Sequence, residues 1–184
     1  PQQAGPLWNR LLGAAGVGPR LRVAFLHERT AETSGWTYAH EMGRGEVQRV
    51  FHERVETWAC DDVLVGKNDE QLLKQAVERG ADVVFTTTPK LMPATLKAAV
   101  TWPQVKFLNC SLHMTHPYVR TYYGRIHEAK FILGAIAGSM AQDGRLGYIA
   151  SYPTYGMTAG VNAFALGAQL VNPRAAVYVD WTAR

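Results

Sequence analysis

Short apolar runs alternate with longer amphipathic segments along most of the chain. The run "LRVAFL" at 21–26 is typical of a buried strand, and "GWTYAHEMGRGEVQRVFHE" at 35–53 has the spacing of an amphipathic helix. The same alternation predicts further strands at 55–60, 81–88 and 105–110, and helices at 68–80 and 89–102. Asn68 is placed to cap its helix and Gly80 to end it. Strands that alternate with helices in this way indicate βαβ units, and therefore a parallel sheet with helices on both faces.

A looser segment at 111–124 interrupts the alternation before it resumes. The second series consists of a helix at 125–142, a strand at 145–150, a helix at 156–171 and a strand at 175–181. A lobe with two strands would leave much of its sheet exposed. We therefore expect an α/β fold of two Rossmann-like lobes joined by a hinge. The expected parts are an N-terminal extension at 1–20, a first lobe with the hinge segment at 21–123, and a truncated second lobe at 124–184, so that the chain is a fragment.

Composition and charge narrow the classes of protein. The chain has 184 residues, of which 47% are hydrophobic and 18% charged, with a net charge of +4. The basic residues are scattered, so we do not expect a nucleic-acid partner. No apolar stretch approaches the roughly 20 residues of a membrane helix, and the opening segment lacks the features of a secretory signal. Cys60 and Cys110 lack zinc or thioredoxin spacing, so we interpret them as core residues, with a disulfide as the minor alternative.

Ligands of open parallel sheets bind beyond the carboxyl ends of the strands. The segments at these positions contain hydroxyl groups, an amide and aromatic rings, but few catalytic bases. Such neutral groups favour a polar, uncharged, planar ligand. Trp36 stands where the first strand gives way to a helix, and Asn109 ends the fourth strand. Tyr155 follows a strand of the second series and could form a second wall of the site.

Each of these residues also has a purely structural interpretation. Trp36 could be a staple onto the core rather than a platform for a flat ligand. Asn109 could close a loop instead of binding a ligand. The threonines at 86–88 fit equally a run of high β-propensity and a row of hydroxyls that faces the cleft.

No pattern of a known catalytic or metal site is visible. No nucleophile elbow, dinucleotide-binding glycine motif or P-loop follows any strand. His113 and His116 could hold a metal, but no matching carboxylate pattern accompanies them. The carboxylates near strand ends are scattered: Glu28, Glu32, Asp61, Asp62 and Asp180. We therefore predict that the protein is not an enzyme and uses neither a cofactor nor a metal.

Two long stretches resemble a known family. They are "RTYYGRIHEAKFILGAIAG" at 120–138 and "LGYIASYPTYGMTAGVNAFALGAQLVNP" at 146–173. Both are similar to segments of the basic membrane protein (BMP) family, which includes the purine nucleoside receptor lipoproteins. These are substrate-binding proteins of ABC transporters with the type I periplasmic binding fold. The resemblance extends over about 21–181.

The resemblance also implies roles for individual residues. In "SGWTYAHEMG", Trp36 takes the place of the family's phenylalanine that stacks on the purine, and Thr37 or Tyr38 that of its asparagine. Asn109 lies near the position of a ligand-binding acidic or amide residue. The family's usual aspartate is replaced here by Glu32 or Thr33. The expected ligand-binding residues are Trp36, Thr37, Tyr38, Thr87, Asn109, Tyr155 and Trp181, of which Tyr155 and Trp181 are matched by position alone.

The function implied by the resemblance is ligand capture without catalysis. A small polar planar molecule, foremost a purine nucleoside, would be enclosed in a cleft between the lobes and delivered to an ABC transporter permease. The family resemblance places such a protein at the extracytoplasmic face of the plasma membrane. No signal sequence or lipobox cysteine is visible in the chain, so a cytoplasmic ligand-sensing or regulatory domain of the same fold is the alternative.

Overall fold

The computed structural model describes residues 20–112, 116–151, 153 and 155–182. The chain divides into two compact units, and the boundary lies between Tyr122 and Tyr123. The elements of the first unit are β1 (Leu21–Leu26), α2 (Gly35–Phe51), the 3₁₀ helix η2 (His52–Arg54), β2 (Val55–Cys60), α3 (Asp69–Glu78), β3 (Val83–Thr86), the 3₁₀ helix η3 (Pro89–Leu91), α4 (Met92–Thr101), β4 (Lys106–Cys110) and β5 (Val119–Tyr122). Those of the second unit are α5 (Ile126–Met140), β6 (Arg145–Ala150), α6 (Tyr155–Val171) and β7 (Ala176–Trp181).

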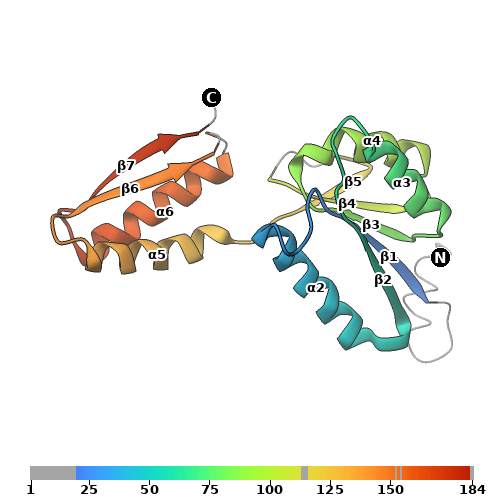
Figure 1. Cartoon of the computed structure of the whole chain (residues 1–184), viewed down its shortest axis with the longest axis horizontal. Coiled ribbons are helices and arrows are strands. Elements are labelled where there is room, and N and C mark those ends of the chain that lie inside the picture. The colour runs from blue at the N-terminus through green and yellow to red at the C-terminus, as the bar shows by residue number, and fades with distance from the viewer. Residues whose placement is uncertain (1–19, 113–115, 152, 154, 183–184) are drawn as a thin grey trace, which may run out of the picture. The chain divides into compact units, whose positions relative to one another are not determined.

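The first unit is built on a five-stranded parallel sheet of order β2-β1-β3-β4-β5. Figure 1 shows α2 on one face of this sheet and α3 with α4 on the other. The predicted α/β class and parallel sheet are thus confirmed. Because neighbouring strands run in the same direction, their carboxyl ends meet at one edge, which we call the carboxyl edge.

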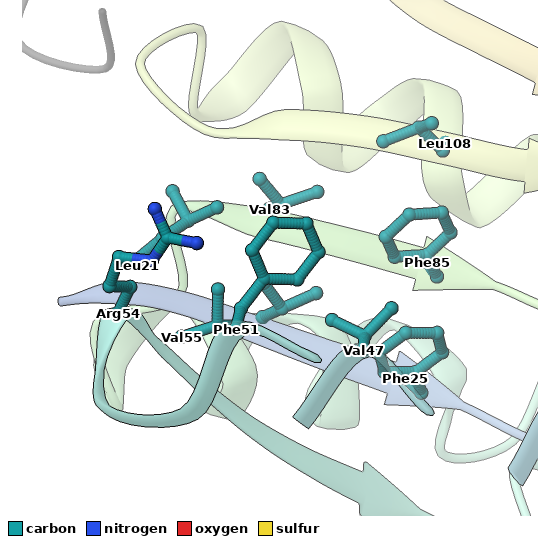
Figure 2. Close-up of a pocket in the computed structure, with 10 residues that line it drawn as sticks. Leu21, Phe25, Val47, Phe51, Arg54, Val55, Val83, Phe85 and Leu108 are labelled. Carbon is teal, nitrogen blue, oxygen red and sulfur yellow. The ribbon is translucent and has the colours of Figure 1, made fainter. Parts of the chain in front are cut away.

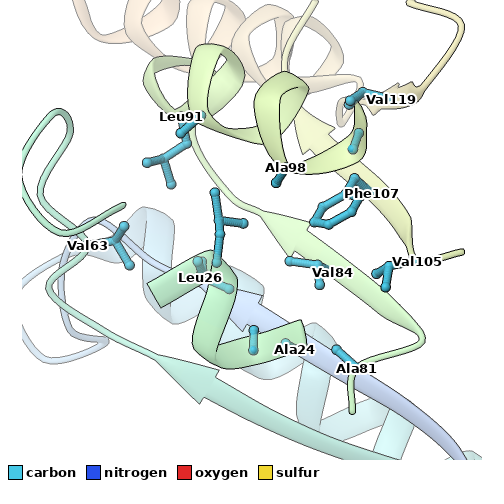
Figure 3. Packing of buried hydrophobic residues seen from close by; sticks show 14 of the residues in the cluster. Ala24, Leu26, Val63, Ala81, Val84, Leu91, Ala98, Val105, Phe107 and Val119 are labelled. Atoms are coloured by element: carbon cyan, nitrogen blue, oxygen red, sulfur yellow. The ribbon is translucent and has the colours of Figure 1, made fainter. Parts of the chain in front are cut away.

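The main core lies between the sheet and the helices α3 and α4. Alternate residues of β1 point to opposite faces, so Ala24 and Leu26 enter this core while Val23 and Phe25 face α2. Figure 3 shows Phe107 from β4 packed among apolar side chains from neighbouring elements. Burial of such side chains contributes about 1.5–3 kcal/mol each, which makes this core the main source of stability of the first unit.

The second unit pairs β6 with β7 in parallel and packs α5 against α6. Glycines allow the two helices to approach closely. A Cβ at Gly134 would collide with the backbone of Phe164, and one at Gly167 with the backbone of Phe131. A Cβ at Gly138 would lie 2.6 Å from the carbonyl oxygen of Ala168. These three glycines are therefore explained by the packing of α5 against α6.

The predicted helices and strands are confirmed, with small differences at their ends. The strand expected over 81–88 is confined to Val83–Thr86, because Pro89 opens a 3₁₀ turn directly after it. Asn68 precedes α3 as predicted but does not cap it. Its Oδ1 accepts from the backbone N–H of Leu64 at 2.6 Å, and its Nδ2 donates to the carbonyl of Asp62. Asn68 therefore stabilises the loop that precedes the helix.

Two further observations concern the described ranges. Both cysteines are free thiols, and Cys110 is buried whereas Cys60 is half-buried. Across those same residues, no helix combines the length and apolar character that crossing a membrane requires.

The helix contact in the second unit gives a first prediction. Gly134→Ala should lower the free energy of unfolding by about 1–3 kcal/mol, because the added methyl group has no space against α6. Gly45→Ala is the matched control, since Gly45 is an exposed glycine within α2 whose added Cβ would touch nothing within 4 Å. This control should be neutral or stabilising by up to about 1 kcal/mol. Urea unfolding of both variants is the measurement, and equal effects would contradict the close helix contact.

Candidate functional site

The carboxyl ends of β1, β3 and β4 lie side by side. Leu26, the last residue of β1, is paired with Thr86, and Thr86 is paired with Asn109. His27 follows β1 directly and Thr87 follows β3 directly, so both residues lie at the carboxyl edge. The hydrogen bond from the backbone N–H of Thr87 to the carbonyl of Leu26, at 3.1 Å, closes the edge at this point.

Trp36 is held at this edge by the start of α2. Ser34 caps the helix by accepting a hydrogen bond from the N–H of Thr37 at 3.2 Å, which fixes where the first turn begins. The indole Nε1–H of Trp36 donates to the backbone carbonyl of Thr87 at 2.6 Å. The side chain remains 37% exposed. The ring is thus anchored along one edge while part of it is open to solvent.

The three threonine side chains after β3 are turned inward rather than exposed at the surface of the first unit. Thr86, Thr87 and Thr88 are all buried. The Oγ1 of Thr86 lies 2.9 Å from that of Thr95 on α4. The Oγ1 of Thr87 donates to the carbonyl of Leu26 at 2.9 Å. These groups satisfy one another and the backbone, because a buried polar group without a partner is costly.

Next to Thr87 lies a buried histidine that sequence reasoning did not single out. His27 has no exposed surface. Its Nδ1 lies 3.0 Å from the Oγ1 of Thr87, and its Nε2 lies 2.9 Å from the Oε1 of Glu41 on α2. Since an ionised carboxylate only accepts, the Nε2 of His27 donates to Glu41. The position of His27 directly after a buried strand was the available signal, but its partner 14 residues later was not visible in the pattern.

Glu41 is in turn held by Arg44. The Nε of Arg44 donates to both carboxylate oxygens of Glu41 at 2.9 Å, and its Nη2 donates to Oε2 at 2.6 Å. These hydrogen bonds are the main reason that the pKa of Glu41 is lowered and that of Arg44 is raised. The Nη1 of Arg44 also donates to Thr57 on β2 at 3.1 Å, which ties α2 to the sheet. We call the linked groups Arg44, Glu41, His27, Thr87 and Trp36 the His27 chain.

Aromatic rings surround the outer end of the His27 chain. The ring centroid of His40 lies 5.2 Å from that of Trp36, 6.2 Å from that of His27 and 6.1 Å from that of Tyr122. Burial is the main cause that lowers the pKa of His40 below 6.5, and burial likewise raises the pKa of Tyr122. Both side chains are therefore neutral at neutral pH. The Nδ1 of His40 donates to the carbonyl of Trp36 at 2.9 Å, which leaves its Nε2 as an acceptor.

Asn109 supports the neighbouring connection from inside. It is fully buried, and its Nδ2 donates to the Oγ1 of Thr86 at 2.8 Å and to the carbonyl of Thr88 at 2.9 Å. Its Oδ1 and the nearby Oγ of Ser111 have no hydrogen-bond partner among the described residues. The amide thus holds the turn after β3 and keeps one acceptor unused there.

The remaining predicted ligand-binding residues lie in different surroundings. Thr37 is buried, whereas Tyr38, the next residue on α2, is 55% exposed. Trp181 is the last residue of β7, where it is paired with Ala150 of β6, and Tyr155 begins α6. The structure therefore links Trp36, Thr87 and the turn held by Asn109 within the first unit. Tyr155 and Trp181 belong to the second unit.

An apolar groove of about 420 Å³ lies between α2 and the sheet, away from the carboxyl edge. In Figure 2, Val47 and Phe51 of α2 face the sheet across this groove. The strand residues opposite them are Phe25, Val83, Phe85 and Leu108. Its lining is apolar apart from Arg54, so it lacks the polar groups that orient a hydrophilic ligand. We place the candidate site at Trp36 rather than in this groove.

No group of three or more His, Cys, Asp or Glu side chains within the described ranges is arranged to hold a metal ion. His116 is described, but His113, its predicted partner, lies outside the described residues.

Comparisons with known proteins agree with this architecture. A family model described as ABC transporter substrate-binding protein, PnrA-like, matches residues 20–184. A purine-binding protein of Brucella abortus is 35% identical over 92% of this chain and 48% of its own length. A putative ABC transporter glucose-binding protein of Haloferax volcanii is 27% identical over 92% of this chain and 43% of its own length. The chain thus spans about half the length of these curated relatives.

A solved structure shows the same fold at low sequence identity. An ABC transporter solute-binding protein from Conexibacter woesei superposes with a TM-score of 0.68 at 17% identity, over 88% of this chain and 54% of the other. This likeness concerns the fold alone, whereas the family model extends across nearly all of the sequence. The chain therefore belongs to the Bmp family of PnrA-like ABC transporter substrate-binding proteins.

Proposed function

We propose that the protein captures a purine base or nucleoside and presents it to an ABC transporter. The observation that carries this proposal is the state of Trp36, whose ring is partly exposed and fixed by a hydrogen bond to the carbonyl of Thr87. A flat aromatic ligand that stacks on such a ring gains about 0.5–1.5 kcal/mol beyond the burial of area. A ring that is already oriented also loses less conformational entropy when the ligand binds.

The groups around Trp36 suit an uncharged ligand. His40 and Tyr122 are kept neutral by burial, and the carboxylate of Glu41 is paired with Arg44 and His27. A purine presents two faces for stacking and several neutral donors and acceptors at its edges. These match the neutral Nε2 acceptor of His40 and aromatic surface better than they match a phosphate or a carboxylate ligand.

The predicted ligand-binding residues take two kinds of role in this proposal. Trp36 and the exposed Tyr38 contact the ligand from the first unit. Tyr155 and Trp181 keep the ligand-binding role that the family resemblance implies. Thr37, Thr87 and Asn109 are buried, so they act by holding the start of α2 and the turn after β3 in place.

The relatives support a purine first and a sugar second. The Brucella abortus relative is named for purine binding, and it is the more similar of the two curated relatives. The Haloferax volcanii relative is named for glucose binding, so a sugar is the second candidate. By analogy with the family we infer extracytoplasmic capture for a permease, and a cytoplasmic sensor of the same fold is the alternative.

Replacement of Trp36 tests the proposed stacking. Trp36→Ala should weaken purine binding by roughly ten-fold or more, because it removes both stacking and buried area. Trp36→Phe should lose less, since it keeps an aromatic face and loses only the bond to Thr87. The measurement is calorimetry of the full-length protein against adenine, adenosine, inosine, guanosine, uridine, ribose and glucose.

Phe51→Ala provides the matched control for this series. Phe51 lies at the other end of α2 with a similar exposure, 41% against 37% for Trp36. Its replacement should leave the affinity unchanged. If the folded protein bound none of the purines, the purine proposal would be wrong, and binding of glucose or ribose would transfer the site to a sugar.

The partial burial of His40 predicts a pH dependence. Because burial lowers its pKa in the folded protein below 6.5, the unfolded chain takes up a proton first as the pH falls. The stabilising contribution of neutral His40 is therefore complete above pH 6.5 and decreases as the pH falls through 6.5 toward the folded pKa. NMR titration of the His40 ring should give a midpoint below 6.5, and His40→Gln should reduce the loss of stability in mild acid. A midpoint at or above 6.5 would contradict the burial.

A further inference from the structure

We infer that His27 and Glu41 are positioning residues for ligand binding, which act on the ligand through Thr87 and Trp36 without touching it. This inference rests on the proposed role of Trp36 as the platform. It extends that role to residues that hydrogen bonds link to the platform through Thr87. Two long-range contacts carry it, the bond from the indole of Trp36 to the carbonyl of Thr87 and the bond from His27 to Glu41.

The two contacts fix the same part of α2 against the same turn. Trp36 and Glu41 lie in the first half of α2. Trp36 bonds Thr87 directly, and Glu41 bonds His27, which lies 3.0 Å from the Oγ1 of Thr87. Thr87 is therefore held through both its carbonyl and its hydroxyl. A shift of the turn after β3 would have to break both links or carry the helix with it.

Burial restricts the movement of His27 and Thr87, the inner members of the His27 chain. His27 and Thr87 have 0% and 1% of their surface exposed. Loss of the Glu41 carboxylate would leave the Nε2–H of His27 without the acceptor that it has in the folded protein. The side chain of His27 would then have to turn toward another acceptor, and that movement would release its contact with Thr87.

A purely structural role does not account for Trp36, which is the outer end of the His27 chain. The Trp36 side chain is partly exposed, so water could satisfy its indole N–H if the ring turned outward. The bond to the Thr87 carbonyl selects one orientation among those that solvent would allow. The His27 chain thus keeps the carbonyl at the place where it can hold the ring.

The same helix offers a matched pair of substitutions. Glu41 pairs with Arg44 and Glu46 pairs with Arg49, in both cases three residues later, but only Glu41 reaches a buried histidine. Glu41→Ala therefore removes the His27 contact, while Glu46→Ala removes only an exposed ion pair. Glu41→Gln keeps an oxygen that can accept from His27 and serves as the conservative variant.

The readouts are the NMR signal of the Trp36 indole N–H and the affinity for adenosine, both measured on the full-length protein. The signal is assigned with Trp36→Phe and followed in the protein without ligand. We expect Glu41→Ala to shift this signal, to accelerate its hydrogen exchange and to weaken adenosine binding about ten-fold. Glu46→Ala should change none of these, and Glu41→Gln should restore most of the affinity and the signal.

The outcomes separate this inference from the proposed function. If Glu41→Ala folds and leaves the indole signal and the affinity as they are in Glu46→Ala, the positioning role is overturned. If adenosine does not bind the unmodified protein, the purine proposal fails, while the indole signal still tests the positioning of Trp36. If Glu41→Ala does not fold, His27→Gln and Glu41→Gln decide the matter with the same two readouts, and an unchanged indole signal in His27→Gln overturns the inference.

Discussion

Fully buried polar side chains at the carboxyl edge have to find their hydrogen-bond partners inside the protein, and this constraint shapes the whole edge. His27, Thr86, Thr87 and Asn109 are at most 1% exposed. Their partners come from the ends of β1 and β3, from α2 and from α4. Because an unpaired buried group costs about 1–3 kcal/mol, each bond restricts the position of the next element. The edge is therefore rigid where the strands end, and the partly exposed Trp36 is attached to that rigid part.

The order of helices and strands could be predicted because the chain signals it locally. Apolar runs such as 21–26 and the helical spacing of 35–51 are properties of neighbouring residues, and short connections exclude most other topologies. The structure differs from the prediction where a side chain binds a partner, or a residue starts a turn, that the local pattern does not indicate. Asn68 stands at the position of a helix cap, yet its amide binds the preceding loop. The run of threonines suggests an extended strand, yet Pro89 starts a 3₁₀ turn directly after them.

Sequence analysis could predict at which edge of the sheet the candidate site lies, but only in part how its side chains are oriented. Position after a parallel strand places Trp36, Thr87 and Asn109 at one edge, since strand polarity alone decides this. Position does not decide whether a side chain faces solvent or the interior. Trp36 remains partly open, whereas Thr87 and Asn109 turn inward to satisfy the backbone. The pairing of His27 with Glu41 depends on how α2 lies across the sheet, which no local pattern of residues encodes.

The way in which Trp36 is anchored bears on how one scaffold can serve different ligands. Its partner is a backbone carbonyl, so a change of side chain at position 87 would not by itself remove the acceptor. A flat apolar face of this kind contributes affinity to any ligand with a flat or apolar face of its own, and it discriminates little among them. Discrimination then falls to the polar groups around the ring, which can change without disturbing the platform. Under the proposed function, this division allows the same platform to accept different ligands as the polar groups around it change.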